Sequence, residues 1–163
     1  MDNRQNSTNI NWYPGHMEKT KREIAKLTPL IDFVLELIDA RIPRSSKVVG
    51  IDDLIKGNPR ILVMTKKDLA DADETKKWVG FYEKQGYEVV LVDLKSQNGH
   101  VSIIEKIDKI SEEINAKRKQ RGMKPKVLRG LVLGIPNVGK STLINKLAKK
   151  NVAGVGNIPG FTK

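Results

Sequence analysis

The sequence predicts an α/β fold in which helices flank a parallel sheet, and two observations support this. Four apolar, strand-like segments alternate with segments of helical periodicity along the 163 residues, a pattern that is typical of parallel sheets. Residues 134–142, GIPNVGKST, fit G-x-x-x-x-G-K-[ST], a loop that joins a buried strand to a helix. We therefore expect one α/β domain with a phosphate-binding loop near its C-terminal end.

The elements follow in order from a polar segment, residues 1–10, which we expect to be a disordered leader. Residues 12–17 (WYPGHM) form a predicted aromatic turn, because Pro-Gly favours turns. A helix with one basic face is expected over about 17–27, where Pro29 ends it. The predicted strands are 32–38, 60–64, 87–94 and 128–134, and the remaining predicted helices are 50–56, 73–85, 101–119 and the one after the phosphate loop, to about 150.

Composition limits the function classes. The net charge is +11, and we expect a polyanionic partner, most simply RNA. We expect the RNA to contact the basic face of the first helix and a basic linker over 117–129. For the helix, the alternative is a basic face that is simply solvated. The chain has no cysteine, no signal-peptide core and no apolar run of transmembrane length, which suits a cytoplasmic protein.

The phosphate loop carries predicted chemistry at each position. Its backbone N–H groups and the following helix N-terminus would cradle a β-phosphate. Lys140 would reach the β- and γ-phosphates, and the Ser141 hydroxyl would bind Mg²⁺. The predicted nucleotide contacts of this loop are Pro136, Asn137, Val138, Gly139, Lys140, Ser141 and Thr142.

A second motif, Thr65-Lys66-Lys67-Asp68, follows a predicted buried strand, where open α/β sheets place their ligands. It resembles the [N/T]-K-x-D motif with which GTPases read guanine. Asp68 would accept hydrogen bonds from guanine N1–H and the 2-amino group, donors that adenine lacks. Lys66 would lie over the base, and Thr65 stands where asparagine is commoner. Alone, the tetrapeptide also fits a solvated turn. The loop after the third strand, with Asp93-Leu94-Lys95 or the neighbouring Ser96, is the predicted other wall of the base pocket.

The motif order is permuted relative to Ras-like GTPases, in which the phosphate loop comes first. Together with Trp12–Met17, Asp39-Ala40-Arg41-Ile42-Pro43 and Pro159-Gly160-Phe161-Thr162, this order resembles the circularly permuted GTPases of bacterial ribosome biogenesis. The resemblance implies a permuted P-loop NTPase fold over 11–163, with GTP, GDP, the large ribosomal subunit and rRNA as partners. It makes Thr162 the switch threonine and a second Mg²⁺ ligand, with Pro159 and Gly160 beside the nucleotide.

The chain departs from that family in what it lacks. No D-x-x-G follows Thr162, and strands 2 and 3 of the Ras-like sheet and the family's C-terminal domain are not expected in this chain. The strand at 128–134 is therefore predicted to be an exposed edge.

Two further residues are candidates for catalysis. His16 is the predicted water-orienting residue and completes a predicted catalytic set with Lys140 and Thr162. The alternative for His16 is a structural role in which it caps the first helix. The Asn137 carboxamide oxygen would bind K⁺ in GTPases that use a monovalent cation, and a turn-stabilising asparagine is its alternative.

Three functions remain open from the sequence. The first is a GTP-hydrolysing assembly factor for the large ribosomal subunit. The second is a guanine-nucleotide-dependent RNA-binding module without useful turnover, because D-x-x-G is missing. The third, an ATP-using P-loop enzyme, is opposed by Asp68. The sequence does not predict an oligomeric state.

Overall fold

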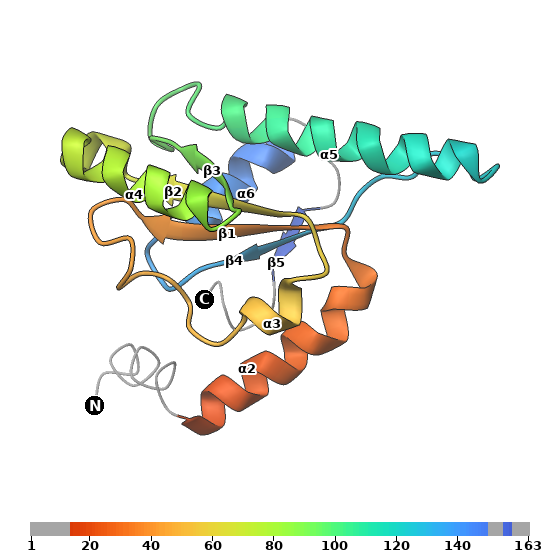
Figure 1. The fold of residues 1–163 in the computed structure, drawn as a ribbon, viewed down its shortest axis with the longest axis horizontal. Helices are drawn as coiled ribbons and strands as arrows, with labels where there is room; N and C mark the ends of the chain where they lie inside the picture. Colours follow the sequence, from red (N-terminus) through yellow and green to blue (C-terminus); the bar gives the residue numbers. More distant parts are fainter. Residues whose placement is uncertain (1–13, 150–154, 158–163) are drawn as a thin grey trace.

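A computed structural model describes residues 14–149 and 155–157, with side chains described for 18–149. Its centre is a five-stranded parallel sheet in the order β3-β2-β1-β4-β5 (Figure 1). The strands are β1 Phe33–Asp39, β2 Arg60–Thr65, β3 Glu88–Leu91, β4 Gly130–Leu133 and β5 Val155–Asn157. The helices are α2 Pro14–Leu27, α3 Asp52–Ile55, α4 Ala72–Lys84, α5 Val101–Gln120 and α6 Lys140–Lys149, with 3-10 turns at Thr28–Leu30 and Lys67–Leu69.

Strand β1 is buried on both faces, because helices cover both sides of the sheet. Phe33, Leu35 and Leu37 pack with Ile103 and Ile107 of α5 and with the apolar residues of α6. The alternate side chains pack against α2, α3 and α4 on the opposite face. This period-2 division of one apolar run gives the molecule its three layers, which Figure 1 shows with α5 above the sheet and α2 and α3 below it.

Two expectations about the ends of elements were wrong. The first helix begins at Pro14, so residues 14–17 belong to α2 and not to an aromatic turn. Proline suits the first helical position, because its fixed φ fits the helix and its missing N–H has no helical partner there. The third strand ends at Leu91, short of Leu94, where the chain enters a series of turns.

The predicted exposed edge at 128–134 was also wrong. Strand β4 pairs with β1 on one side and with β5 on the other, in the register Gly130↔Val155 to Val132↔Asn157. A short strand after the phosphate-loop helix thus covers β4 and satisfies backbone groups that an edge strand would expose.

The sheet determines where function can lie. Because all strands are parallel, their C-terminal ends meet at one edge, with Asp39 of β1 in register with Thr65 of β2. The loop after β4 begins at the same edge. Both predicted nucleotide motifs are therefore at the carboxyl ends of strands, the usual ligand position in such sheets.

Candidate functional site

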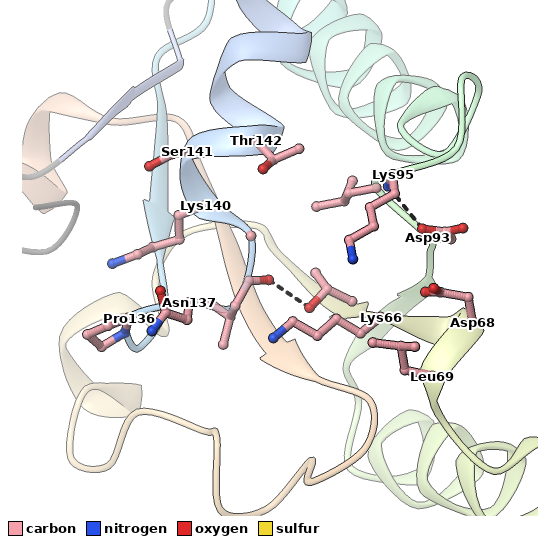
Figure 2. A pocket seen from close by; sticks show the side chains of 14 residues that line it. Lys66, Asp68, Leu69, Asp93, Lys95, Pro136, Asn137, Lys140, Ser141 and Thr142 are labelled. Carbon is pink, nitrogen blue, oxygen red and sulfur yellow. Dashed lines mark hydrogen bonds between the residues drawn. The ribbon is translucent and has the colours of Figure 1, made fainter.

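A cavity of about 370 Å³ opens at the C-terminal edge of the sheet. Three loops line it: one after β2, one after β3 and one between β4 and α6. Figure 2 shows Pro136, Asn137 and Lys140 on one side and Asp68, Leu69 and Asp93 on the other. The lining residues are Thr65, Lys66, Asp68, Leu69, Asp93, Leu94, Lys95, Pro136, Asn137, Val138, Gly139, Lys140, Ser141 and Thr142.

The phosphate-loop wall depends on unusual backbone angles and close packing. Asn137 and Gly139 have φ of 68° and 102°, in the left-handed region that favours asparagine and glycine. A Cβ at Gly134 would lie 2.8 Å from the Val138 side chain and 3.0 Å from the Leu37 carbonyl oxygen. The glycines of the motif thus let the loop curl tightly above β1 and β4.

Thr65 joins the two predicted motifs directly. Its side chain is buried, and its hydroxyl donates a 2.7 Å hydrogen bond to the Val138 carbonyl oxygen in the phosphate loop. The same hydroxyl lies 3.2 Å from the Ile38 carbonyl oxygen at the end of β1. Thr65 therefore ties the loop together through its hydroxyl, although it lacks the second polar group of asparagine.

Lys140 begins α6 and is only 4% exposed. Burial lowers the pKa of its ammonium to about 8, because the charged form loses hydration in the protein. A phosphate group next to the Lys140 ammonium would offset this lost hydration by attracting its positive charge. The site therefore holds a lysine that gains from an anionic ligand.

Lys66 is held by Asp39, the last residue of β1. Its backbone has φ of 62°, and its ammonium lies 3.3 Å from Asp39 Oδ2. Arg41 donates to the same carboxylate from its backbone N–H (2.9 Å) and its guanidinium (2.8 Å). Burial alone would raise the pKa of Asp39, but the hydrogen bonds from Arg41 and Lys66 lower it to about 2. The Asp-Ala-Arg sequence thus provides a permanent carboxylate that positions Lys66.

The third wall is a tight loop over residues 93–99. The Lys95 backbone N–H donates to Asp93 Oδ1 at 2.9 Å (Figure 2), and Ser96 Oγ donates to the Asp93 carbonyl oxygen. A Cβ at Gly99 would lie 1.7 Å from that oxygen, so only glycine fits there. Lys146 of α6 donates to the Ser96 carbonyl oxygen at 2.7 Å, which fastens this loop to the phosphate-loop helix.

The structure brings most of the predicted site residues together. One cavity is lined by all seven predicted residues of the phosphate loop and by Thr65, Lys66, Asp68 and Lys95. The Asp68 side chain is exposed at this cavity. Lys67 and Ser96 do not line the cavity. Ser96 instead helps to shape the 93–99 loop.

Other residues fall outside the prediction or outside the described part of the chain. Leu69 lines the cavity and was not predicted, whereas Asp93 and Leu94 line it within the loop that was predicted as the other wall of the base pocket. The signal that could have indicated Leu69 was its position directly after the Thr65–Asp68 motif. His16 lies in the first turn of α2, and only its backbone is described. Pro159, Gly160 and Thr162 lie outside the described residues.

Comparison with known proteins supports this reading of the motifs. Residues 129–163 match a family described as 50S ribosome-binding GTPase. The chain is 46% identical over 153 residues to "Ribosome biogenesis GTPase A" of Bacillus licheniformis, covering 94% of this chain and 54% of that protein. A protein of the same name from Thermotoga maritima is 38% identical, covering 94% and 52%. The chain spans about half the length of the curated relatives it matches.

Solved structures agree with the fold. A GDP-bound structure of YlqF is 32% identical with a TM-score of 0.56, covering 79% of this chain and 48% of that one. A GNP-bound YlqF from T. maritima is 33% identical with a TM-score of 0.57, covering 79% and 47%. These matches confirm the predicted class, a circularly permuted P-loop GTPase fold. Within the described residues, no helix has both the length and the apolar character needed to cross a membrane.

Proposed function

We propose that this chain, which resembles ribosome biogenesis GTPase A over 94% of its length, binds GTP and GDP, hydrolyses GTP and acts in assembly of the large ribosomal subunit. The observation that carries the proposal is the joining of a guanine motif and a phosphate loop in one cavity. The 2.7 Å hydrogen bond from Thr65 to Val138 fixes the two motifs relative to each other. The cytoplasm, predicted from the cysteine-free composition, remains the proposed location.

The base would lie at the wall formed by the loops after β2 and β3. Asp68 is exposed to the cavity and would accept the two guanine donors. Lys66, held by Asp39, would place its methylene stem along the base. The backbone N–H groups of the 93–99 loop would lie near guanine O6, with Lys95 and Ser96 in that loop. Adenine would leave the Asp68 carboxylate without donors, so ATP is expected to bind much more weakly.

The phosphates would lie at the opposite wall. Lys140 would pair with the β- and γ-phosphates, and the loop N–H groups would bind phosphate oxygens. The Ser141 hydroxyl lines the cavity next to Lys140, and a hydroxyl oxygen suits Mg²⁺, which keeps water and phosphate oxygens as its other ligands. The bound ion would neutralise charge on the β- and γ-phosphates. Thr162 is the proposed second protein ligand.

Asn137 is the proposed K⁺ ligand. Its left-handed backbone, with φ of 68°, belongs to the phosphate loop, and the residue lines the cavity. A carboxamide oxygen is a suitable ligand for a hard cation. Faster GTP hydrolysis in K⁺ than in Na⁺, lost in Asn137→Ala, would support this role. Equal rates in both salts would leave Asn137 as a residue that shapes the loop.

His16 is the proposed water-orienting residue. A histidine can hold a water by hydrogen bonding without forming a covalent intermediate, which is sufficient for phosphoryl transfer. His16→Ala should reduce GTP hydrolysis while nucleotide affinity stays within about twofold. Equal turnover in the variant and the parent would remove His16 from the mechanism.

A turnover assay tests the proposal as a whole. Phosphate release from GTP is followed with Mg²⁺ present, with and without purified large ribosomal subunits. Turnover that requires Mg²⁺ and rises with subunits is the expected result. Nucleotide binding without turnover in either condition would favour the second candidate, a guanine-nucleotide-dependent RNA-binding module.

A further inference from the structure

The positive charge of the chain is concentrated in one part of the sequence. Residues 1–113 contain 18 Lys or Arg and 19 Asp or Glu, and are close to neutral. Residues 114–163 contain 12 Lys or Arg and no Asp or Glu. Seven of these 12 cations lie within residues 117–129. The excess of +11 is therefore not a general surface property but belongs to the second half of the permuted domain.

These seven cations form a projection, which we call the basic prong (residues 115–129). The last residue of α5 that packs against the core is Ile114. The six remaining residues of α5 extend beyond the sheet by about 9 Å, at 1.5 Å per residue, and the chain then turns back toward β4. Figure 1 shows this end of α5 projecting past the sheet with the returning segment beside it.

The turn of the prong is a well-formed helix cap. Gly122 has φ of 71°, its N–H donates to the Lys119 carbonyl oxygen at 3.0 Å, and the Met123 N–H donates to the Arg118 carbonyl oxygen at 2.9 Å. This is the pattern of a Schellman motif, which ends a helix in a defined direction. The prong is thus a folded element and not a loose linker.

Side chains fasten the returning segment to the helix. Asn115 Oδ1 accepts from the Lys126 N–H at 2.9 Å, and its Nδ2 donates to the Lys126 carbonyl oxygen at 3.2 Å. Arg118 Nε donates to the Lys124 carbonyl oxygen at 2.9 Å. Lys126 also forms an ion pair with Asp32 beside β1. The backbone of the returning segment, which carries Lys124 and Lys126, is therefore held next to the helix that carries Lys117 to Lys119.

The charge exceeds what the helix needs for its own stability. Lys117, Arg118 and Lys119 lie in the last turn of α5, where cations interact favourably with the helix dipole. That explanation does not extend to Lys124 and Arg129, which lie on the returning segment. The exposed cations of the prong are Lys117, Lys119, Arg121, Lys124, Lys126 and Arg129, and Met123 and Val127 are exposed beside them.

We propose that the basic prong is an RNA-docking surface that binds the phosphate backbone. A dense group of cations is complementary to a polyphosphate chain, and the ordered backbone that carries them reduces the entropy lost on binding. The inference rests on the proposed function, because it names the part of this chain that would meet ribosomal RNA. The prong joins α5 to β4, so bound RNA would lie on the segment that connects the two halves of the nucleotide site.

The charge of the prong is tested with Lys119→Gln, Arg121→Gln and Lys124→Gln combined. Lys76→Gln, Lys77→Gln and Lys84→Gln on α4 form the matched control, because these lysines are also exposed and the same charge is removed. Binding to a labelled RNA hairpin is measured by fluorescence anisotropy over a range of salt. The prong variant should bind at least about tenfold more weakly near 0.1 M salt, with the log–log salt slope smaller by roughly 2. The control variant should change both values little.

The fixed shape of the prong is tested separately with Asn115→Ala, which removes the contacts to Lys126 without changing charge. We expect affinity for the hairpin to fall by a few fold with an unchanged salt slope. Circular dichroism melts confirm that each variant is folded.

Several results would overturn the inference. Equal losses of RNA affinity in the prong and control variants would contradict a local surface, as would an unaffected prong variant. Binding of the parent chain to phosphatidylserine vesicles but not to RNA would contradict the choice of partner. Affinity for fluorescent GDP is measured on the same samples. A parent chain that binds RNA through the prong but binds no GDP would overturn the proposed function and leave the prong intact.

Discussion

The two walls of the cavity are built by different means. The phosphate-loop wall depends on backbone shape, with Asn137 and Gly139 in left-handed conformations and Gly134 packed against Val138 and Leu37. The opposite wall also contains one left-handed residue, Lys66, but its side chains are placed by hydrogen bonds and charge from Asp39 and Asp93. The proposed function therefore assigns affinity and base selectivity to separate walls. The first wall suits any nucleoside phosphate, and the second would decide which base is accepted.

Asp68→Ala gives the sharpest separation of the two walls. Loss of two charge-assisted hydrogen bonds should reduce the preference for GDP over ADP by about 10²-fold or more. Binding of ADP itself should change little, because the phosphate wall is intact. Isothermal titration with both nucleotides measures the effect. Asp73→Ala, an exposed carboxylate in the first turn of α4, is the control. A preserved guanine preference in Asp68→Ala would contradict the assignment of this wall.

Lys140→Met tests the other wall. It should weaken GTP and GDP binding by about ten- to a hundredfold, since hydrogen bonds to charged groups contribute about 1.5–3 kcal/mol, while the guanine preference stays as in the parent. Lys95→Met is the matched control, because Lys95 also lines the cavity but belongs to the base side. A change in base preference in Lys140→Met would show that the walls are not independent.

The pH dependence follows from the same lysine. Burial lowers the pKa of Lys140 to about 8, so the ammonium form, which is the form proposed to bind phosphate, predominates only below that pH. GDP affinity should fall by up to about tenfold per unit as pH rises above 8, and binding should take up a proton there. Titration calorimetry at pH 8.5 in two buffers of different ionisation enthalpy measures the uptake. Flat affinity from pH 7 to 9.5 would contradict the shift.

Folding stability should change with pH in the opposite direction to GDP affinity. Between pH 8 and the ordinary lysine value of 10.5, the unfolded chain holds more protons at this residue than the folded chain. The contribution of Lys140 to the free energy of unfolding therefore rises with pH across this window. Lys140→Met should remove that contribution from the pH profile of urea unfolding.

Thr65→Val should have the smallest effect on nucleotide binding. It removes the hydrogen bond that connects the two walls of the cavity. Valine keeps the shape but removes the hydroxyl that donates to the Val138 carbonyl oxygen. We expect a loss of about 1–2 kcal/mol in the free energy of unfolding and a few-fold weaker binding of both GDP and ADP. Thr65→Ser, which keeps the hydroxyl, should restore most of the binding. Equal behaviour of the two variants would mean that the hydrogen bond does not couple the walls.

The sequence allowed most of the fold to be predicted, and most of the predicted site residues line one cavity, because the motifs depend on local residue types. Strand β1 was predicted from its apolar run, and the phosphate loop from its glycines and Lys140. The order of the motifs predicted a permuted domain. These features need only short stretches of sequence, and tertiary packing did not override them.

Features that depend on distant residues could not be predicted. Buried Glu36 of β1 is paired with Lys47 from the segment after β1, at 3.1 Å, and with Arg60 at the start of β2, at 3.4 Å. Asp39 supports Lys66 across a strand register that only the folded sheet defines. The cover of β4 by β5 likewise depends on a three-residue strand too short for a sequence pattern to indicate. The Schellman cap of the prong had a local signal in Gly122, but its fastening by Asn115 did not.

Isothermal titration of the chain with GDP, GTP and ATP tests whether one cavity joins a guanine-reading wall to a phosphate-binding wall. We expect one site per chain, with GDP and GTP binding at least about 10²-fold more tightly than ATP. Equal affinities for the guanine and adenine nucleotides, or no binding of GDP, would contradict it.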